Sequence, residues 1–501
     1  MSTLKHRFIA CFAFGLIAIL PNLALAQLGG RDPEMVRLFE AGKVSMLDEN
    51  WDEALVSFEE AKKLDTDRTF TELYFWTGEA LRELEDYQNA IKNYTDAIRV
   101  QDDFAQAHNG LGICWREQGQ YDVALNSFRN AEQYDRRDAA IAANLGDILI
   151  NTFRDPADGM QYLDRAIELN PEDAEAYRNR GFGHALLNEF EEGIADLTKA
   201  AELDPSDYET YDRLASVHAA EEEHEKSIAA LTKAIETYEP EESSDPDTYI
   251  NGYLSRARER MLLAKEDEQT GPQREALYEQ IVTDADAVLE EFPDRFPESG
   301  MAMFRKGLAL RMQGLFAEAI TAFTDALQII PAGQESNYTA EAYLYRGICW
   351  FYQGQTSLAR GDFKEAAAQS YADPLPHLWI GYTQAKDGEY RKAIESYGEA
   401  AAKSPSFALA YVNRGLAYIK LGDYEKAADN FNKAIRAEPT AATHYFKSGR
   451  AHEMLDRWDE ALAFYNLALQ RDGEFEEAKQ GAARALRALG RPSLSDIQRG
   501  L

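Results

Sequence analysis

Apolar and polar residues follow one another along most of the chain with the period of an α-helix. Over the stretch 408–441, apolar residues recur at spacings of three and four on two successive segments, which places them on one face of a helix. The pair Gly422-Asp423 separates the two segments, and Pro439 follows the second. The pattern therefore predicts two short amphipathic helices joined by a turn, the second ending before Pro439.

This pattern recurs every 34 residues when the sequence is compared with itself. Its fixed places in the stretch 408–441 are Tyr411, Gly415, Tyr418, Gly422, Tyr424, Ala427, Phe431, Ala434 and Pro439. The windows 71–104, 105–138, 174–207, 340–373, 374–407 and 442–475 repeat these places closely, while 35–68, 139–173, 208–241 and 300–333 match more loosely. One such hairpin cannot bury its own apolar face, so the pattern predicts a stack of hairpins.

The fixed places resemble the signature of the tetratricopeptide repeat family, which has Trp or Tyr, Leu-Gly, Tyr, Ala, Phe, Ala and Pro across one repeat. The resemblance implies an all-α fold, a right-handed superhelical solenoid of about twelve antiparallel helix-turn-helix repeats. It also implies protein or peptide binding, with the first helix of each repeat on the concave surface. Some members hold a peptide carboxylate with Lys and Asn residues, but only fragments of that arrangement occur here, namely Asn413, Lys447 and Arg450.

Breaks in the pattern divide the chain. We expect a leader at 27–34, an N-terminal repeat array at 35–241, a degenerate repeat with insertions at 242–299, and a C-terminal array at 300–475. A capping helix at 476–489 and a flexible tail at 490–501 follow. In the degenerate repeat, the pattern predicts a first helix from about Thr248 to Lys265 and a turn that contains Gly271-Pro272. Two sub-arrays and one continuous superhelix are both compatible with this organisation.

Residues 1–26 have the features of a secretory signal peptide. Lys5 and Arg7 precede a nearly continuous apolar run, and Ala24-Leu25-Ala26 supplies small residues for cleavage before Gln27. A retained membrane anchor is the alternative. No later segment is long and apolar enough to span a membrane. We expect a bacterial protein that is periplasmic or secreted.

Charge and cysteine content narrow the function. The net charge of −34 disfavours nucleic acid and anionic membranes and would attract basic partners, although solvated helix faces explain it equally well. Cys114 and Cys349 remain after cleavage and sit in apolar helical stretches. We expect buried free thiols rather than a disulfide.

Motifs for catalysis or for cofactors are lacking in the sequence. It has no phosphate-binding Gly-Lys-Ser/Thr loop, no His-Glu-x-x-His and no Cys-x-x-Cys, so we expect no enzyme activity, no cofactor and no metal. His184, His218 and His452 share the repeat place of Tyr418. A metal-binding or pH-sensing pair is one interpretation. Packing of imidazole in the place of tyrosine is the interpretation that we prefer.

The family resemblance places repeat positions 2, 5, 9 and 12 on the concave surface. In the N-terminal half these positions are mixed, with Asn109, Arg116, Arg178, Phe182, Asp212 and Ser216. In the C-terminal array they are apolar, and we expect a partner-binding groove there formed by Leu344, Ile348, Phe351, Leu378, Tyr382, Val412, Leu416, Ile419 and Phe446, with Leu375 and Leu409 in the same stripe. The alternative is that neighbouring helices cover these residues.

These observations predict a non-catalytic scaffold that binds one or more proteins in a bacterial cell envelope. A basic partner, an amphipathic helix or an extended apolar segment would suit the predicted groove. A self-associating assembly protein is the first alternative. An enzyme that uses the array as a substrate cradle is the second and lacks any supporting motif.

Overall fold

The computed structural model describes residues 31–238, 246–266, 268–331 and 337–491. These residues form 25 α-helices, one π-helical turn and no strand, which confirms the expected all-α fold. The predicted signal peptide, residues 27–30 of the leader and residues 492–501 of the tail lie outside the described residues.

The chain divides into two compact units, Met1–Glu259 and Arg260–Leu501, here called the N-terminal and C-terminal units. The boundary falls within the degenerate repeat predicted at 242–299. Helices of the N-terminal unit are α3 (Pro33–Leu47), α4 (Trp51–Leu64), α5 (Thr71–Glu83), α6 (Tyr87–Val100), α7 (Ala105–Glu117), α8 (Tyr121–Tyr134), α9 (Ala139–Asp147), the π-helix η2 (Ile148–Thr152), α10 (Pro156–Leu169), α11 (Ala174–Leu186), α12 (Phe190–Leu203), α13 (Tyr208–Ala220) and α14 (His224–Thr237).

Helix α15 (Pro246–Leu263) spans the boundary between the units. The C-terminal unit continues with α16 (Gly271–Glu291), α17 (Glu298–Met312), α18 (Phe316–Gln328), α19 (Thr339–Tyr352), α20 (Thr356–Gln369), α21 (Leu375–Lys386), α22 (Tyr390–Lys403), α23 (Ala408–Lys420), α24 (Tyr424–Ala437), α25 (Ala442–Glu453), α26 (Trp458–Arg471) and α27 (Glu476–Ala488).

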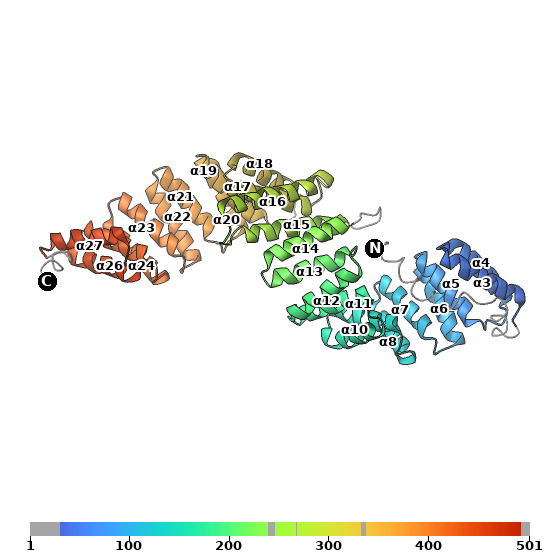
Figure 1. Cartoon of the computed structure of the whole chain (residues 1–501). Coiled ribbons are helices and arrows are strands. Elements are labelled where there is room, and N and C mark those ends of the chain that lie inside the picture. Colours follow the sequence, from blue (N-terminus) through green and yellow to red (C-terminus); the bar gives the residue numbers. More distant parts are fainter. Residues whose placement is uncertain (1–30, 239–245, 267, 332–336, 492–501) are drawn as a thin grey trace. The chain divides into compact units, whose positions relative to one another are not determined.

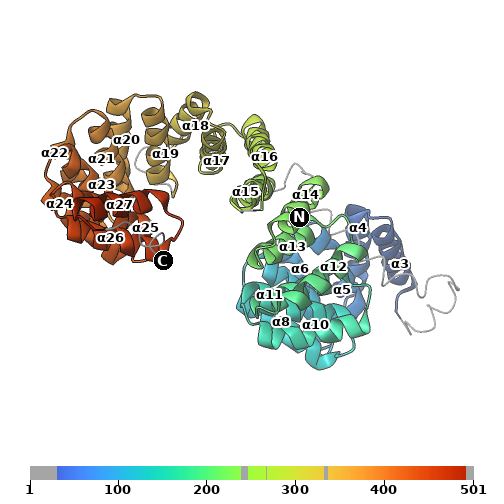
Figure 2. The ribbon, with the colours of Figure 1, turned by 60° about the vertical axis from the view of Figure 1, so that its left-hand side comes forward.

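Helices pack as consecutive hairpins. Helix α3 packs against α4, α5 against α6, and so on to α25 against α26, apart from the α15–α16 region. Figures 1 and 2 show consecutive helices side by side within each unit. First helices of neighbouring hairpins also contact one another, as α9 and α11 do in the N-terminal unit and α19 and α21 do in the C-terminal unit. Each unit therefore presents one surface made by its first helices, which we call its first-helix face.

Buried rings occupy the repeat place of Phe431. Seven further residues at that place are fully or almost fully buried aromatic side chains: Phe58, Tyr94, Phe128, Phe323, Phe363, Tyr397 and Tyr465. Gly415 shows why the repeat has a small residue opposite this ring, because a Cβ at position 415 would lie 2.7 Å from Cε1 of Phe431. Gly422 ends α23 with φ +76, a backbone conformation that glycine adopts without strain. The recurring residues are thus those that pack the two helices of each hairpin together and end the first helix.

One hairpin is irregular because it contains an extra residue. Window 139–173 is one residue longer than its neighbours, and the π-helix Ile148–Thr152 follows α9 directly in this window. The amide of Phe153 donates to the carbonyl of Ile148 at 3.1 Å, which is an i to i+5 bond. A π-bulge absorbs a single inserted residue without ending a helix, so the loose match of this window has a structural reason.

The predicted turn of the degenerate repeat was placed too late along the chain. Gly271 and Pro272 form the first turn of α16 and not the turn before it. Thr270 is the N-cap, and its backbone amide donates to the side chain of Gln273 at 2.9 Å. Proline fits the first turn of a helix, where its missing amide costs nothing, and the capping contact sets the start of the helix.

Both cysteines expected to be buried thiols are free and buried, which confirms that prediction. Burial raises the pKa of each thiol to about 12, so both stay protonated at neutral pH. Of the helices in the described ranges, none combines the length and the apolar character that a membrane crossing requires.

Candidate functional site

The first-helix face of the C-terminal unit contains the residues predicted to form a groove. They lie on α19, α21, α23 and α25. Leu344, Ile348, Leu378 and Val412 are buried in core clusters, so these four side chains are not available to a partner. Three of them hold repeat position 5. Leu378 packs with Tyr397 of the second helix α22 and Ala410 of the next first helix, which shows that this position faces neighbouring helices.

The other five predicted groove residues keep contact with solvent. Leu416 is exposed, whereas Phe351, Tyr382, Ile419 and Phe446 are half-buried. Leu375 and Leu409, at repeat position 2, are exposed as well. The apolar stripe is thus narrower than the sequence predicts, and its accessible part consists of Phe351, Leu375, Tyr382, Leu409, Leu416, Ile419 and Phe446.

An aromatic patch adjoins these leucines. It comprises Phe351, Tyr352, Trp379 and Tyr382, whose rings meet edge to face. The ring centroids of Trp379 lie 5.4 Å from Phe351 and 5.2 Å from Tyr382, and Tyr352 is exposed. Such pairs stabilise one another beyond their area of contact. Tyr352 and Trp379 are not among the residues predicted from the sequence, although the run Trp350-Phe351-Tyr352 at the end of α19 and the nearby pair Trp379 and Tyr382 on α21 could have indicated them.

Polar contacts fix the orientation of the aromatic patch. The amide nitrogen of Asn413 on α23 donates to the Tyr382 hydroxyl on α21 at 3.1 Å. Lys386 Nζ lies 4.4 Å from the centre of the Phe351 ring and donates to the carbonyl of Phe351 at 3.0 Å. Burial raises the pKa of Tyr382, so its hydroxyl stays neutral. The patch is a preformed apolar surface with polar groups at its edges.

The first-helix face of the N-terminal unit is polar instead. A hydrogen-bonded network connects the first helices of four hairpins, with η2 counted as the continuation of α9. Asp147 of α9 accepts from Arg116 of α7 at 2.8 Å and from Asn179 of α11 at 3.3 Å. Asn179 in turn accepts from Asn151 of η2 at 3.0 Å and from Arg213 of α13 at 3.3 Å. Asn144 of α9 donates to Asn109 of α7 at 3.0 Å. The mixed character predicted at Asn109 and Arg116 therefore belongs to one connected surface.

A buried ion pair and a stacked ring extend this network. Arg178 Nη1 donates to Asp207 at 2.6 Å, with both side chains almost fully buried. Burial opposes the charge of Arg178, but Glu209, Asp207 and Glu175 together raise its pKa above the ordinary value. The guanidinium groups of Arg154 and Arg213 lie 5.1 Å and 4.6 Å from the centre of the Phe182 ring. Charged groups are held here in fixed positions.

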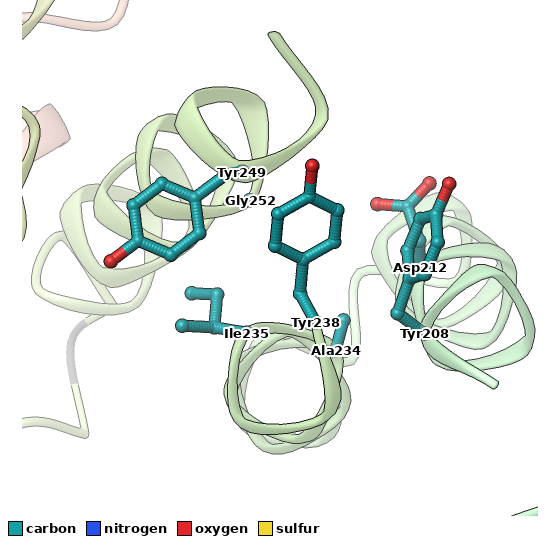
Figure 3. Close-up of a pocket in the computed structure, with 7 residues that line it drawn as sticks. All are labelled: Tyr208, Asp212, Ala234, Ile235, Tyr238, Tyr249 and Gly252. Atoms are coloured by element: carbon teal, nitrogen blue, oxygen red, sulfur yellow. The ribbon is translucent and has the colours of Figure 1, made fainter. Parts of the chain in front are cut away.

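A hollow lies beside this network between α13, α14 and α15. Tyr208, Asp212, Ala234, Ile235, Tyr238, Tyr249 and Gly252 line it (Figure 3). Its volume is about 20 Å³, which is room for about one water molecule. Of its lining residues, only Asp212 belongs to the positions considered in the sequence analysis.

Two of the three histidines that share a repeat place bind carboxylates within their own hairpins. Nδ1 of His184 lies 2.8 Å from Glu189, and Nδ1 of His218 lies 2.7 Å from Glu223. The ring of His452 stacks on Phe464 with centroids 5.2 Å apart, and burial lowers its pKa. Within the described ranges, no group of three His, Cys, Asp or Glu side chains could hold a metal ion. These contacts favour the packing interpretation.

Comparison with known proteins gives matches along much of the chain. A family model described as tetratricopeptide repeat matches residues 77–125, 116–174, 152–208, 274–335, 380–442 and 412–476, and a second model with the same description matches 208–239. Among solved structures, Cut9–Hcn1 of the APC/C is 15% identical (TM-score 0.38), with 92% of this chain and 98% of that chain covered. Yeast Tom70 is 13% identical, with a TM-score of 0.37, and the match covers 91% of this chain and 96% of Tom70. PilW, a type IV pilus biogenesis factor, is 19% identical, with a TM-score of 0.39, and the match covers 46% of this chain and 96% of PilW.

Proposed function

Because the chain belongs to the tetratricopeptide repeat family, we propose that it is a non-catalytic scaffold whose C-terminal first-helix face binds a protein partner in a bacterial cell envelope. The observation that carries this proposal is a set of exposed apolar side chains, Leu375, Leu409 and Leu416, next to the aromatic patch. An accessible apolar surface on a strongly acidic chain is typical of an interaction site.

The spacing of these residues suits a helical partner. Leu375 and Tyr382 lie seven residues apart on α21, and Leu409 and Leu416 lie seven apart on α23. Residues two turns apart lie on the same side of a helix, so the two pairs form parallel stripes. An amphipathic helix could insert its apolar side between such stripes, as in other helix-in-groove complexes. Basic residues on the outer side of that helix would complement the net charge of −34.

Substitution of the exposed leucines tests the proposal. We expect the double variant Leu409→Asp/Leu416→Asp to lose its partner, with at least about a hundredfold weaker binding, because two charges would enter an apolar contact. The readout is affinity capture from the native envelope with quantitative mass spectrometry. Leu358→Asp/Leu421→Asp is the matched control, since Leu358 and Leu421 are 50% and 44% exposed while Leu409 and Leu416 are 44% and 41% exposed.

Equal loss of the captured protein in both double variants would contradict the proposal, as would unchanged capture in the first. Circular dichroism of each variant controls for folding. Light scattering of the purified wild-type chain separates partner binding from self-association, because a monomer at working concentration eliminates the self-assembly alternative.

Export is the second element of the proposal. After expression of the full chain in a bacterial host, we expect the periplasmic or secreted protein to begin at Gln27, because Ala24 and Ala26 supply the small residues that signal peptidase requires. N-terminal sequencing provides the readout. The variant Ala24→Glu/Ala26→Glu is expected to keep its full length. A wild-type chain that begins at Met1 and remains in the membrane fraction would favour the retained-anchor alternative.

A further inference from the structure

Two positive charges lie on the C-terminal first-helix face next to its apolar part. Lys447 and Arg450 are one turn apart on α25, at repeat positions 6 and 9. Lys447 is half-buried and Arg450 is exposed. Within the described ranges, neither side chain forms a hydrogen bond or an ion pair. On a chain with a net charge of −34, two neighbouring cations without counter-charges are an unusual feature.

Lys447 differs in this respect from the lysines of the preceding helix. Lys426 and Lys433 on α24 each contact an aspartate at 2.7 Å. Burial lowers the pKa of Lys447 below its ordinary value, because the ammonium group loses hydration that no neighbouring carboxylate replaces. A bound carboxylate would supply the missing counter-charge and stabilise the charged form.

The register of the repeats places Lys447 beside the exposed leucines. Asn413, at position 6 of α23, donates to the hydroxyl of Tyr382, at position 9 of α21, at 3.1 Å. A contact between the same two positions joins α11 to α9. Applied to α25 and α23, this register pairs Lys447 with Leu416. The positive charge therefore adjoins the apolar surface on which the proposed function rests.

The apolar surface extends as far as α25 itself. Phe446 precedes Lys447 on this helix, is half-buried and packs with Tyr465 and Phe475. A partner whose apolar side covers Phe446 has its main chain above α25, so that a side chain of the partner, and not its chain end, meets Lys447. Arg484 of the next first helix, α27, is already paired with a glutamate of α25 at 2.8 Å, so it does not compete for the same group.

We propose that the helix bound by this face carries an aspartate or glutamate at the edge of its apolar side, and that Lys447 and Arg450 bind that carboxylate. The inference rests on the proposed function, because it names the chemistry of the partner at the same face. Two cations one turn apart can each contact one oxygen of a single carboxylate. The contact also fixes the direction of the partner helix, because its acidic residue lies over α25 while its apolar residues lie over α21 and α23.

Carbodiimide crosslinking of the captured complex tests this contact. The reagent joins a carboxyl group to a lysine amine by an amide bond without a spacer, and the carbodiimide takes up the elements of water to become a urea. The full mature chain is captured with its partner from the native envelope, treated, digested and analysed by mass spectrometry. We expect Lys447 to be linked to an aspartate or glutamate side chain of the partner. Lys364, which is exposed on the second helix α20, is the control and should yield no link to the partner.

Charge substitutions at position 447 provide a second measurement. Lys447→Glu should weaken binding of the partner at least about tenfold, because it brings like charges together, and Lys447→Gln should weaken it about threefold, because it removes one favourable pair. Lys364→Glu is the matched control and should leave binding unchanged. Circular dichroism of each variant establishes that the helices remain folded.

Failure of this inference can be distinguished from failure of the proposed function. If Leu409→Asp/Leu416→Asp loses the partner, then either unchanged binding in Lys447→Glu or the absence of a link from Lys447 overturns the inference and leaves the proposed function intact. A link to the terminal carboxylate of the partner would overturn the assignment to a side chain, and a link to a second copy of this chain would overturn the assignment to a different protein. If no captured protein depends on Leu409 and Leu416, the proposed function itself is wrong and the inference with it.

Discussion

Replacement of Leu378 by aspartate is expected to lower the free energy of unfolding of the C-terminal unit by about 4 kcal/mol or more. The variant loses the packing of a buried leucine, which costs about 2–5 kcal/mol, and it places a carboxylate without a designed partner among apolar side chains. Leu378 is 2% exposed and packs with Tyr397 and Ala410 between α21, α22 and α23. Leu378 was predicted from the sequence to contact a partner, but in the structure it packs between two neighbouring hairpins.

Leu375→Asp is the matched control for this prediction. Leu375 lies on the same helix but is 38% exposed, and an acidic residue in the first turn of a helix interacts favourably with its dipole. We expect a change of less than about 1 kcal/mol. Urea unfolding followed by circular dichroism provides the comparison. Equal stability of Leu378→Asp and Leu375→Asp would show that position 378 is not part of the core.

The second large effect is expected at the buried ion pair of the N-terminal unit. Arg178→Leu should cost about 3–5 kcal/mol, because removal of one partner leaves a charge in a desolvated site. Asp207 would keep the hydroxyl of Thr210, at 2.6 Å, and the amide of Glu209, at 3.1 Å, but no longer the guanidinium. Asp207 is also the N-cap of α13, so the loss should destabilise the start of that helix.

A double variant separates the charge from the packing. Arg178→Leu/Asp207→Asn removes both charges and keeps an oxygen that can cap α13, so we expect recovery of at least half of the lost stability. Arg37→Leu is the control for an exposed pair. Arg37 contacts Glu34 at 2.6 Å with both side chains exposed, and such pairs add little to stability because water and salt screen them. An equal effect of Arg178→Leu and Arg37→Leu in urea unfolding would contradict the assigned role.

The fold could be predicted well from the sequence because the same residues recur at the same places in many repeats. Phe431 and its equivalents recur at one place, and each needs a small residue such as Gly415 opposite it. A single window would be compatible with several packings, but the same residues in many windows leave only stacked hairpins. The insertion in window 139–173 appears in the sequence only as a looser match, because the apolar pattern does not show that a π-helix absorbs the extra residue.

The candidate site was predicted only in part, for a physical reason. A helical period identifies the apolar side of a helix but not which part of that side a neighbouring helix covers. Leu378 and Leu416 therefore look alike in the sequence, whereas one is buried by α22 and α23 and the other is exposed. The tyrosine hollow was missed because Tyr238 and Tyr249 come from opposite ends of a stretch in which the repeat pattern fails.

The most direct test of the central claim is site-specific photocrosslinking in the native envelope. A photoreactive phenylalanine derivative is placed at position 409 or 416 on the C-terminal first-helix face, and at position 358 or 421 as a control. We expect positions 409 and 416 to yield a covalent adduct with one and the same protein, and positions 358 and 421 to yield none. Adducts that form at 358 or 421 but not at 409 or 416 would contradict the assignment of this face as the partner-binding surface.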